Sequence, residues 1–419
     1  MYKYVLFAFA WLMPYLASAV SKSDNRQKLF ETKSGDSIPY RIPAIATCSN
    51  GDLIAVSDYR YCGADIGLGH VDLHYRISKD NGKNWGPEQM LADGSGDESV
   101  GNVWNYAYGD CAICADRNSN EVIVLCAAGK SPYYSSTRNN PNRVALFRSH
   151  DNGKTWDQGK EITEQIYGLF DARQNGPIRS LFCGSGKIHQ SRYVKVGKYY
   201  RLYTALCTKS GNFVIYSDDF GENWKVLGDI NESCCEDGDE PKCEEEPDGS
   251  VILSSRAWGR MFNVFTFTNI QKGEGKWDRR AKALDFADIK NACNGEILLV
   301  PAIRLSDKSK TVLAIQSVPF GPKRTNVGFF YKDIRSPHLN AQELATDWHK
   351  GLQVSQQESA YSTMTLQHNY QIGFLWEEGP VFKGRGYCID YLPLSVKTIT
   401  KGQYTADVTA LKKGYRQLK

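Results

Sequence analysis

The stretch S-K-D-N-G-K-N-W at residues 78–85 recurs as S-H-D-N-G-K-T-W at 149–156 and as S-D-D-F-G-E-N-W at 217–224. All three copies keep Ser, Asp, Gly and Trp in the same places, at intervals of about 70 residues. Glycine accepts a positive φ, aspartate accepts hydrogen bonds from turn N–H groups, and tryptophan packs on a core. Repetition at a fixed period indicates one repeated supersecondary unit. The octapeptide therefore predicts a recurring hairpin corner that belongs to the scaffold and takes no part in chemistry.

Short strand-like segments dominate the remainder of the chain. They are rich in β-branched and aromatic residues and are separated by turn dipeptides such as Asn50-Gly51. The clearest segments are residues 53–56, 122–126, 199–206, 213–216, 251–255, 261–267, 296–300 and 371–376. Short helical turns are expected at residues 288–294 and 340–344. Because strands and helices do not alternate, the pattern predicts an all-β protein whose sheets surround a central axis, as in a β-propeller.

Composition limits the classes of partner. The net charge is +4, and no long basic run is present, which argues against a nucleic-acid partner. No Pro/Ser/Gly-rich linker divides residues 20–419, so one domain is expected there. Cys111 and Cys114 form a close pair, but no second such pair or histidine pair completes a metal site. We therefore expect no metal and no cofactor.

The first 19 residues have the pattern of a secretory signal peptide. Lys3 precedes an apolar run at residues 5–16, and Ala17-Ser18-Ala19 resembles a cleavage site. The apolar run is short for a membrane span, and no other segment qualifies. We expect a secreted or periplasmic protein without a membrane span. All twelve cysteines follow this segment, and an even number in an exported protein predicts disulfides whose pairing the sequence leaves open.

The motif Tyr40-Arg41-Ile42-Pro43 precedes the first octapeptide. Together with the three octapeptides, which match the Asp box, it resembles the bacterial-type sialidase (exo-α-sialidase, neuraminidase) family. The resemblance runs from about residue 37 to about residue 390. It implies a six-bladed β-propeller and a glycoside hydrolase that removes terminal sialic acids from glycoproteins, glycolipids and oligosaccharides.

The resemblance assigns three arginines to the carboxylate of the substrate. They are Arg41, Arg256 in P-D-G-S-V-I-L-S-S-R, and Arg324 in K-R-T-N-V, where the matching context is shortest. A planar guanidinium stays protonated and pairs with a carboxylate through two parallel hydrogen bonds. The type of residue therefore suits an anionic sugar.

Asp65, in the glycine-flanked sequence G-A-D-I-G, matches the general acid and base of the family. Its ordinary pKa of about 3.9 must be raised for it to donate a proton near neutrality. The resemblance also implies that Arg60 binds the 4-hydroxyl of the sugar. Asp110 lines the N-acetyl pocket or is a turn residue, and Asp58 is expected to be structural.

Tyr361 matches the nucleophile, Glu240 the residue that takes its proton, and Glu377 the residue that holds Arg41. Sialidases are the exception among retaining glycosidases in using tyrosine. The anomeric carbon of sialic acid bears a carboxylate, so it repels an anionic nucleophile more than a phenol that loses its proton during attack. A phenol of pKa about 10 needs the base and the nearby guanidiniums.

The sequence leaves several alternatives open. Four other glutamates compete with Glu240, which is favoured because it lies 16 residues before Arg256; they are Glu236, Glu244, Glu245 and Glu246. A fourth octapeptide is eroded, since residues 331–348 keep only Asp333 and Trp348. The same site residues serve trans-sialidases and intramolecular trans-sialidases. A noncatalytic sugar-binding or scaffold propeller is a further alternative, because Asp boxes also occur in propellers that are not sialidases. The oligomeric state is unknown.

Overall fold

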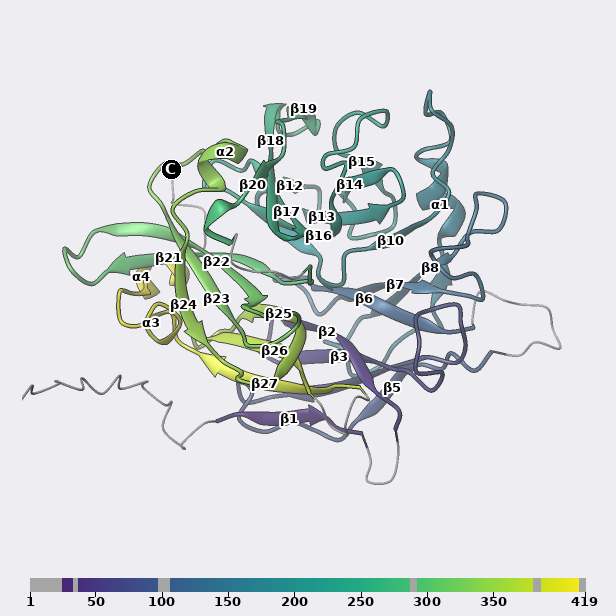
Figure 1. The fold of residues 1–419 in the computed structure, drawn as a ribbon, viewed down its shortest axis with the longest axis horizontal. Coiled ribbons are helices and arrows are strands. Elements are labelled where there is room, and N and C mark those ends of the chain that lie inside the picture. The colour runs from purple at the N-terminus through teal and green to yellow at the C-terminus, as the bar shows by residue number, and fades with distance from the viewer. Residues whose placement is uncertain (1–24, 33–36, 97–105, 287–291, 380–385, 414–419) are drawn as a thin grey trace, which may run out of the picture.

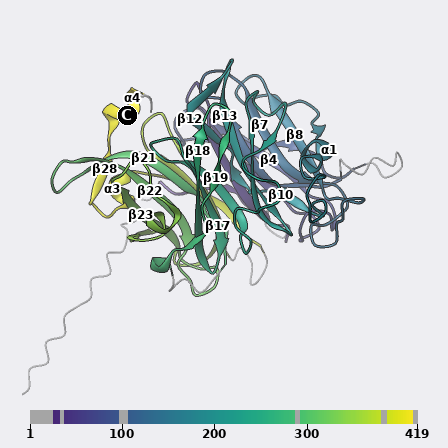
Figure 2. The same cartoon turned by 90° about the horizontal axis from the view of Figure 1, so that it is seen from above.

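A computed structural model describes residues 25–32, 37–96, 106–286, 292–379 and 386–413. These residues form six β-sheets around a central axis (Figures 1 and 2). We call them blades one to six, in the order in which their main strands follow along the chain. The fold is thus the all-β, six-bladed propeller that the sequence predicted. The predicted signal peptide, residues 1–19, lies outside the described residues.

Blades one to three carry the three octapeptides. Blade one has the order β2 (Tyr40–Thr47), β3 (Leu53–Tyr59), β4 (Asp72–Ser78) and β5 (Gln89–Ala92). Blade two has the order β11 (Gly186–Lys187), β6 (Tyr108–Ala115), β7 (Val122–Ala128), β8 (Arg143–Ser149) and β9 (Lys160–Glu161). Blade three has β10 (Leu181–Cys183), β13 (Tyr199–Thr208), β14 (Gly211–Ser217) and β15 (Lys225–Val226), with β12 (His189–Val196) also on β13.

Blades four to six complete the ring. Blade four has β16 (Asp239–Glu245), β17 (Val251–Ala257), β18 (Gly259–Asn269) and β19 (Glu274–Trp277), with β20 (Ala281–Lys282) on β18. Blade five has the order β24 (His349–Gln353), β23 (Val327–Ile334), β22 (Lys310–Pro319), β21 (Ile297–Arg304) and β28 (Tyr404–Ala406). Blade six has the order β1 (Gln27–Phe30), β27 (Cys388–Leu394), β26 (Ile372–Gly379) and β25 (Glu358–Leu366). Blade six therefore combines the first strand with the last long ones.

Helices are few and short. They are α1 (Thr163–Gly168), α2 (Ala341–Leu344), α3 (Val396–Ile399), α4 (Val408–Lys412) and a 3₁₀ turn at Leu284–Phe286. The helical turn expected at residues 340–344 is confirmed as α2, which a capping box between Asn340 and Glu343 begins. Of the other expected turn, residues 288–291 lie outside the described residues, and residues 292–294 are not helical, since Ala292 forms a β-bridge with Trp258. Each of the eight predicted strand segments overlaps a strand.

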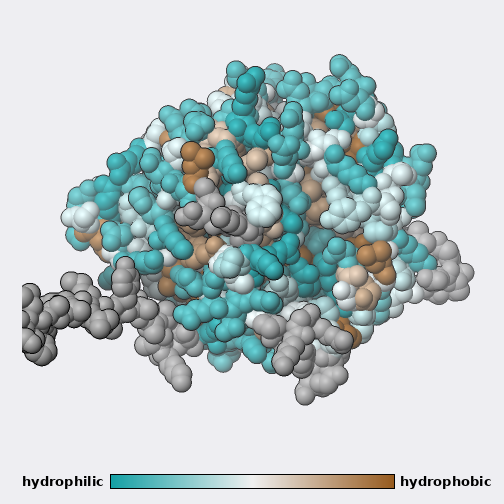
Figure 3. All heavy atoms as spheres, viewed as in Figure 1, coloured by the Kyte–Doolittle hydropathy of each residue, from teal (hydrophilic) through white to brown (hydrophobic). Residues whose placement is uncertain are grey.

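The core is divided among the blade interfaces. Six large clusters of buried apolar side chains each join two neighbouring blades, so every blade packs on both of its neighbours. The outer surface seen in Figure 3 is mainly hydrophilic, with scattered apolar residues. Among the described residues, no helix has the length and apolar character needed to span a membrane.

The three octapeptides form the same turn between the last two strands of blades one, two and three. In the first copy the Ser78 hydroxyl donates to Asp80 at 2.9 Å and accepts from the N–H of Gly82 at 2.8 Å. The other two copies repeat both bonds at 2.8 Å. The three glycines have φ between 79° and 90°. Each tryptophan packs on a blade interface, so the turn fastens the edge of a blade to the core.

The prediction of disulfides is wrong for this structure. All twelve cysteines are described and all are free, and all but Cys62 are buried. They lie mainly on strands and pack in the blade interfaces, where a free cysteine behaves as a small apolar side chain. Burial raises the pKa of Cys48 and Cys183 to about 12, so these thiols stay protonated. The cysteines of this chain therefore serve as packing residues, and their even number does not indicate disulfides.

Candidate active site

A cavity of about 280 Å³ opens where the inner strands of the blades end. Eight of the nine predicted site residues line it, and they come from five blades: Arg41, Arg60, Asp65, Asp110, Glu240, Arg256, Arg324 and Tyr361. Phe182 of β10 adds a residue from blade three. The ninth residue, Glu377, is fully buried behind Arg41. The propeller thus gathers residues that are up to 336 positions apart.

Irregular pairing marks four strands at the positions of predicted site residues. The register shifts between residues 41 and 44 in β2, 109 and 112 in β6, 239 and 241 in β16, and 359 and 362 in β25. Ile42 and Asp110 also have positive φ values of 54° and 53°. A β-bulge turns a side chain away from the regular alternation of a strand. These shifts therefore turn Arg41, Asp110, Glu240 and Tyr361 toward the cavity.

Tyr361 and Glu240 form the centre of the cavity. The Tyr361 hydroxyl donates a short hydrogen bond to Oε1 of Glu240. The Arg256 guanidinium donates from one nitrogen to Oε2 of Glu240 at 2.9 Å and to the Tyr361 oxygen at 3.0 Å. The three groups form a closed triangle of a phenol, a carboxylate and a cation.

The other two arginines lie against the ring of Tyr361. The guanidinium carbons of Arg41 and Arg324 lie 5.5 and 5.3 Å from the ring centroid. Arg324 comes from the segment between β22 and β23, and Arg41 from β2. All three predicted arginines therefore surround one tyrosine, although their side chains belong to blades one, four and five.

The pKa of Tyr361 is raised well above its ordinary value. Burial is the main cause and Glu240 adds to it, while Arg256 and Arg324 lower the pKa without cancelling the rise. The arginines thus act in the expected direction, but their effect does not cancel the rise in the pKa, and the phenol stays protonated. The proton must leave during a reaction, and Glu240 is already placed to receive it.

Glu377 connects Arg41 to the backbone of Tyr361. One carboxylate oxygen accepts from Nε of Arg41 at 2.6 Å and from the N–H of Ile42 at 2.8 Å. The other accepts from the N–H of Tyr361 at 3.0 Å. Glu377 makes the contact with Arg41 that the sequence predicted.

Arg60 lies among three carboxylates and is almost fully buried. It donates to Asp65 at 2.7 Å, to Asp58 at 2.9 Å and to Asp110 at 3.1 Å. Burial raises the pKa of Asp58 to about 8 and that of Asp110 to about 6. The side chain of Asp65 is 65% exposed and that of Asp110 21%, so Asp65 is the most exposed of the three. Arg60 thus fixes one oxygen of Asp65 at the rim of the cavity.

The other glutamates of the acidic segment are engaged elsewhere. Glu244 pairs with Lys187 at 2.9 Å, and Glu245 accepts a hydrogen bond from Ser191 at 2.6 Å. Glu236 is exposed near Arg280 at 3.5 Å. Among the described residues, Glu240 is the glutamate that contacts the Tyr361 hydroxyl.

Several residues in or beside the cavity were not found from the sequence. The ring of Tyr387 lies 5.3 Å from the guanidinium of Arg41, and Asp239 lies 3.3 Å from Nε of Arg256. Tyr133 and Tyr134 also line the cavity, and Tyr134 is 79% exposed. Asp239 could have been found from its place beside Glu240, but the tyrosines stand in segments without a motif.

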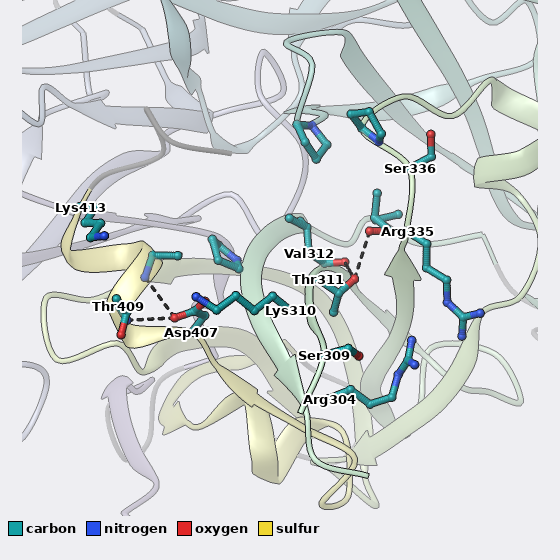
Figure 4. A pocket seen from close by; sticks show the side chains of 15 residues that line it. Arg304, Ser309, Lys310, Thr311, Val312, Arg335, Ser336, Asp407, Thr409 and Lys413 are labelled. Carbon is teal, nitrogen blue, oxygen red and sulfur yellow. Dashed lines mark hydrogen bonds and ion pairs between the residues drawn. The ribbon is translucent and has the colours of Figure 1, made fainter. Parts of the chain in front are cut away.

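A larger cavity of about 660 Å³ lies between the β21–β22 hairpin and α4 (Figure 4). None of the nine predicted site residues lines it. Three of its four basic side chains are already paired with carboxylates, since Arg304 lies 2.9 Å from Asp307, Lys310 lies 3.5 Å from Asp407 and Arg335 lies 3.3 Å from Asp333. Pairing of these charges makes it a weaker candidate for binding an anionic substrate than the cavity around Tyr361.

The sequence of the chain is similar to those of known sialidases over about half of its length. No family model matches the chain. The sialidase of Micromonospora viridifaciens is 29% identical over 228 residues, which is 52% of this chain and 32% of that protein. The chain thus spans about a third of the length of this relative.

Solved structures share the fold over almost the whole chain. A Hadza microbial sialidase superposes with a TM-score of 0.68 at 19% identity, covering 90% of this chain and 69% of that one. The intramolecular trans-sialidase from Ruminococcus gnavus gives 0.66 at 16% identity, covering 91% and 99%. Sequence similarity to sialidases and this shared architecture agree: the chain is a six-bladed propeller of the bacterial sialidase type.

Proposed function

We propose that the chain is an exo-α-sialidase that hydrolyses terminal sialic acids from glycoproteins, glycolipids and oligosaccharides with net retention. One observation carries the proposal: the hydroxyl of Tyr361 lies between the carboxylate of Glu240 and the guanidinium of Arg256. A tyrosine activated by a carboxylate is the nucleophile expected for a sugar whose anomeric carbon already bears an anion. Sequence similarity to sialidases supports a function within that family.

Binding rests on the three arginines in this proposal. Arg41, Arg256 and Arg324 carry permanent charges around the Tyr361 ring, and Glu377 holds Arg41 in place. A carboxylate that enters between them gains charge-assisted hydrogen bonds and replaces solvent. The anomeric carbon next to that carboxylate then faces the Tyr361 oxygen. Arg60 and Asp110 bind the 4-hydroxyl and N-acetyl side of the ring.

The reaction proceeds in two displacements. In the first, Asp65 gives its proton to the glycosidic oxygen as that bond breaks, the Tyr361 oxygen bonds to the anomeric carbon, and Glu240 takes the phenol proton. In the second, Asp65 takes a proton from water, the water oxygen bonds to the same carbon, and Tyr361 leaves and recovers its proton from Glu240. Two inversions give net retention.

An intramolecular trans-sialidase is the second candidate. The solved structure from Ruminococcus gnavus carries that name and covers 91% of this chain. Such an enzyme shares the first displacement but resolves the intermediate with a hydroxyl of the sialic acid itself. A trans-sialidase would resolve it with a hydroxyl of a second sugar. The three products therefore distinguish the three activities.

The test is incubation of the purified protein with 3′-sialyllactose, followed by NMR of the products over time. We expect free sialic acid that is released first as the α anomer, with inhibition by an unsaturated sialic acid analogue. A 2,7-anhydro product would identify the protein as an intramolecular trans-sialidase, and a new sialoside would identify it as a trans-sialidase. Binding of sialyllactose without any turnover would identify a noncatalytic sugar-binding propeller.

The predicted signal peptide supports a further proposal, which is export. Expression of the full chain with a reporter at its C-terminus, followed by N-terminal sequencing of the exported form, tests it. We expect the mature chain to begin at residue 20. Retention of the uncleaved chain in the cytoplasm would reject export.

A further inference from the structure

A second group of ligand-type side chains lies at the opposite end of β16 from Glu240. Glu246 and Asp248 belong to the turn between β16 and β17, and His338 belongs to the segment between β23 and α2. A ring nitrogen and one oxygen from each carboxylate all lie within 4.8 Å of one another. The group thus connects blade four to blade five.

The distances between the candidate ligand atoms differ from those of an ordinary histidine hydrogen bond, in which the ring nitrogen is close to a single acceptor. Nδ1 of His338 lies 3.1 Å from Glu246, 3.2 Å from Asp248 and 3.2 Å from the hydroxyl of Ser250. The Ser250 hydroxyl lies 3.0 Å from the same carboxylate of Asp248. One N–H points at one acceptor, yet three oxygens surround this nitrogen almost equally. Ligand atoms about 2.0 Å from a tetrahedral zinc ion lie about 3.3 Å apart, which is close to all four of these distances.

Charge also favours a cation at this point. The carboxylate of Glu246 is fully buried, and its described partners are His338 and the backbone N–H of Leu339, 3.2 Å away. The carboxylates of Asp248, Asp278 and Glu343 add negative charge around Glu246. Among the described residues, no lysine or arginine forms an ion pair with Glu246. A buried carboxylate in this field is costly unless a positive charge compensates it.

A second histidine group shows the contrast. Nε2 of His70 lies 2.7 Å from Asp72, which is a directed hydrogen bond, and 3.9 Å from Asp93. The same oxygen of Asp72 accepts from the N–H of Gly94 at 2.7 Å. His70 and Asp72 thus form a hydrogen-bonded pair, and Asp93 is a separate carboxylate. We do not propose a metal site there, and His70 provides a control for His338.

We propose that Glu246, Asp248 and His338 bind a divalent cation of the zinc type, with the Ser250 hydroxyl or a water molecule as fourth ligand. The side chains of Asp248 and His338 are 33% and 37% exposed, which gives the ion a route from solvent. The bound ion fastens the β16–β17 turn to the segment before α2. That segment lies in the region where the fourth octapeptide is eroded, so the ion stabilises a blade edge that lacks the complete turn.

The experiment is a titration of the chelator-treated full chain with Co²⁺, read by visible absorption, followed by displacement with Zn²⁺ measured by calorimetry. We expect one equivalent of Zn²⁺ per chain, a zinc-dependent rise in Tm, and the absorption of tetrahedral Co²⁺. His338→Gln should weaken binding at least about tenfold, because it removes the nitrogen ligand. The matched control His70→Gln should bind as the wild type does.

Equal affinity of wild type and His338→Gln overturns the proposal, and so does the absence of binding by the wild type. Loss of binding in His70→Gln places the ion at the other group and overturns it too. If His338→Gln fails to fold by circular dichroism, Asp248→Asn provides the same comparison on the exposed side of the site. None of these measurements uses turnover, so they stand apart from the proposed sialidase activity.

Discussion

Glu377 accepts a 2.6 Å hydrogen bond from Nε of Arg41 and, through its second oxygen, a 3.0 Å bond from the backbone N–H of Tyr361. A single buried carboxylate therefore sets the position of an arginine on blade one relative to the tyrosine on blade six.

Glu377→Gln tests this positioning. The amide keeps the shape but replaces one acceptor with an NH₂ group, which faces either Arg41 or the Tyr361 N–H. A hydrogen bond to a charged group contributes about 1.5–3 kcal/mol, so we expect KM for 3′-sialyllactose to rise about tenfold or more while kcat falls less. The control is Glu358→Gln, at the exposed start of β25. Unchanged KM in Glu377→Gln would show that Arg41 is held by other contacts.

Tyr361→Phe removes the proposed nucleophile but keeps the ring against Arg41 and Arg324. We expect kcat to fall at least about 100-fold, because the variant lacks the oxygen that contacts Glu240 and Arg256 and would form the intermediate. Steady-state kinetics with 3′-sialyllactose measures the loss. Tyr331→Phe, on β23, is the matched control. Full turnover by Tyr361→Phe would end the assignment of the nucleophile.

The octapeptide turns should affect stability and not turnover. Asp80→Ala removes the acceptor for the N–H of Asn84 and the partner of the Ser78 hydroxyl. We expect the free energy of unfolding in urea to fall by about 1–2 kcal/mol, with kcat/KM of the folded protein unchanged. Asp151→Ala and Asp219→Ala should give similar losses, since they repeat the same bonds. A change in kcat/KM at full stability would give the turns a part in chemistry.

The raised pKa of Asp58 should make the stability of the protein depend on pH. Its pKa rises from an ordinary value near 3.9 to about 8 in the folded protein, chiefly because it is buried. The folded state then keeps a proton that the unfolded state releases. The stabilising contribution of this proton to the free energy of unfolding is complete below about pH 4 and is lost as the pH rises through 8. Asp58→Asn carries no such proton. The Tm of Asp58→Asn relative to wild type should therefore increase between pH 4 and 8, whereas the exposed control Asp93→Asn should stay parallel to wild type. Parallel curves for both variants would contradict the raised pKa.

The free cysteines give a direct chemical test. Titration of the unfolded protein with a thiol reagent, without prior reduction, should yield twelve thiols per chain. The Tm should be the same with and without reductant, because no covalent bond is broken. A count below twelve would restore the disulfides that the number of cysteines suggested.

The fold was predictable because local chemistry repeats. Each octapeptide forms its turn with its own residues, such as Ser78, Asp80 and Gly82, so its structure depends little on the rest of the chain. The motifs around Arg41 and Arg256 likewise stand in the sequence, and the structure brings both to Tyr361.

Other properties depend on contacts between distant segments. The net rise in the pKa of Tyr361 reflects burial, which no motif encodes. Tyr387 reaches Arg41 because blades one and six are neighbours in the ring. The number of cysteines gave a wrong prediction of disulfides, because a free cysteine also packs as a small apolar side chain between strands.

Closure of the ring has a consequence for biosynthesis. Strand β1 pairs with β27, matching Gln27 with Tyr391 and Phe30 with Ile389. The sheet that holds Tyr361 stays incomplete until β1 meets β27, a strand that is synthesised after all the strands of blades one to four. Completion of blade six therefore waits on a contact of very long sequence separation, and such contacts form slowly.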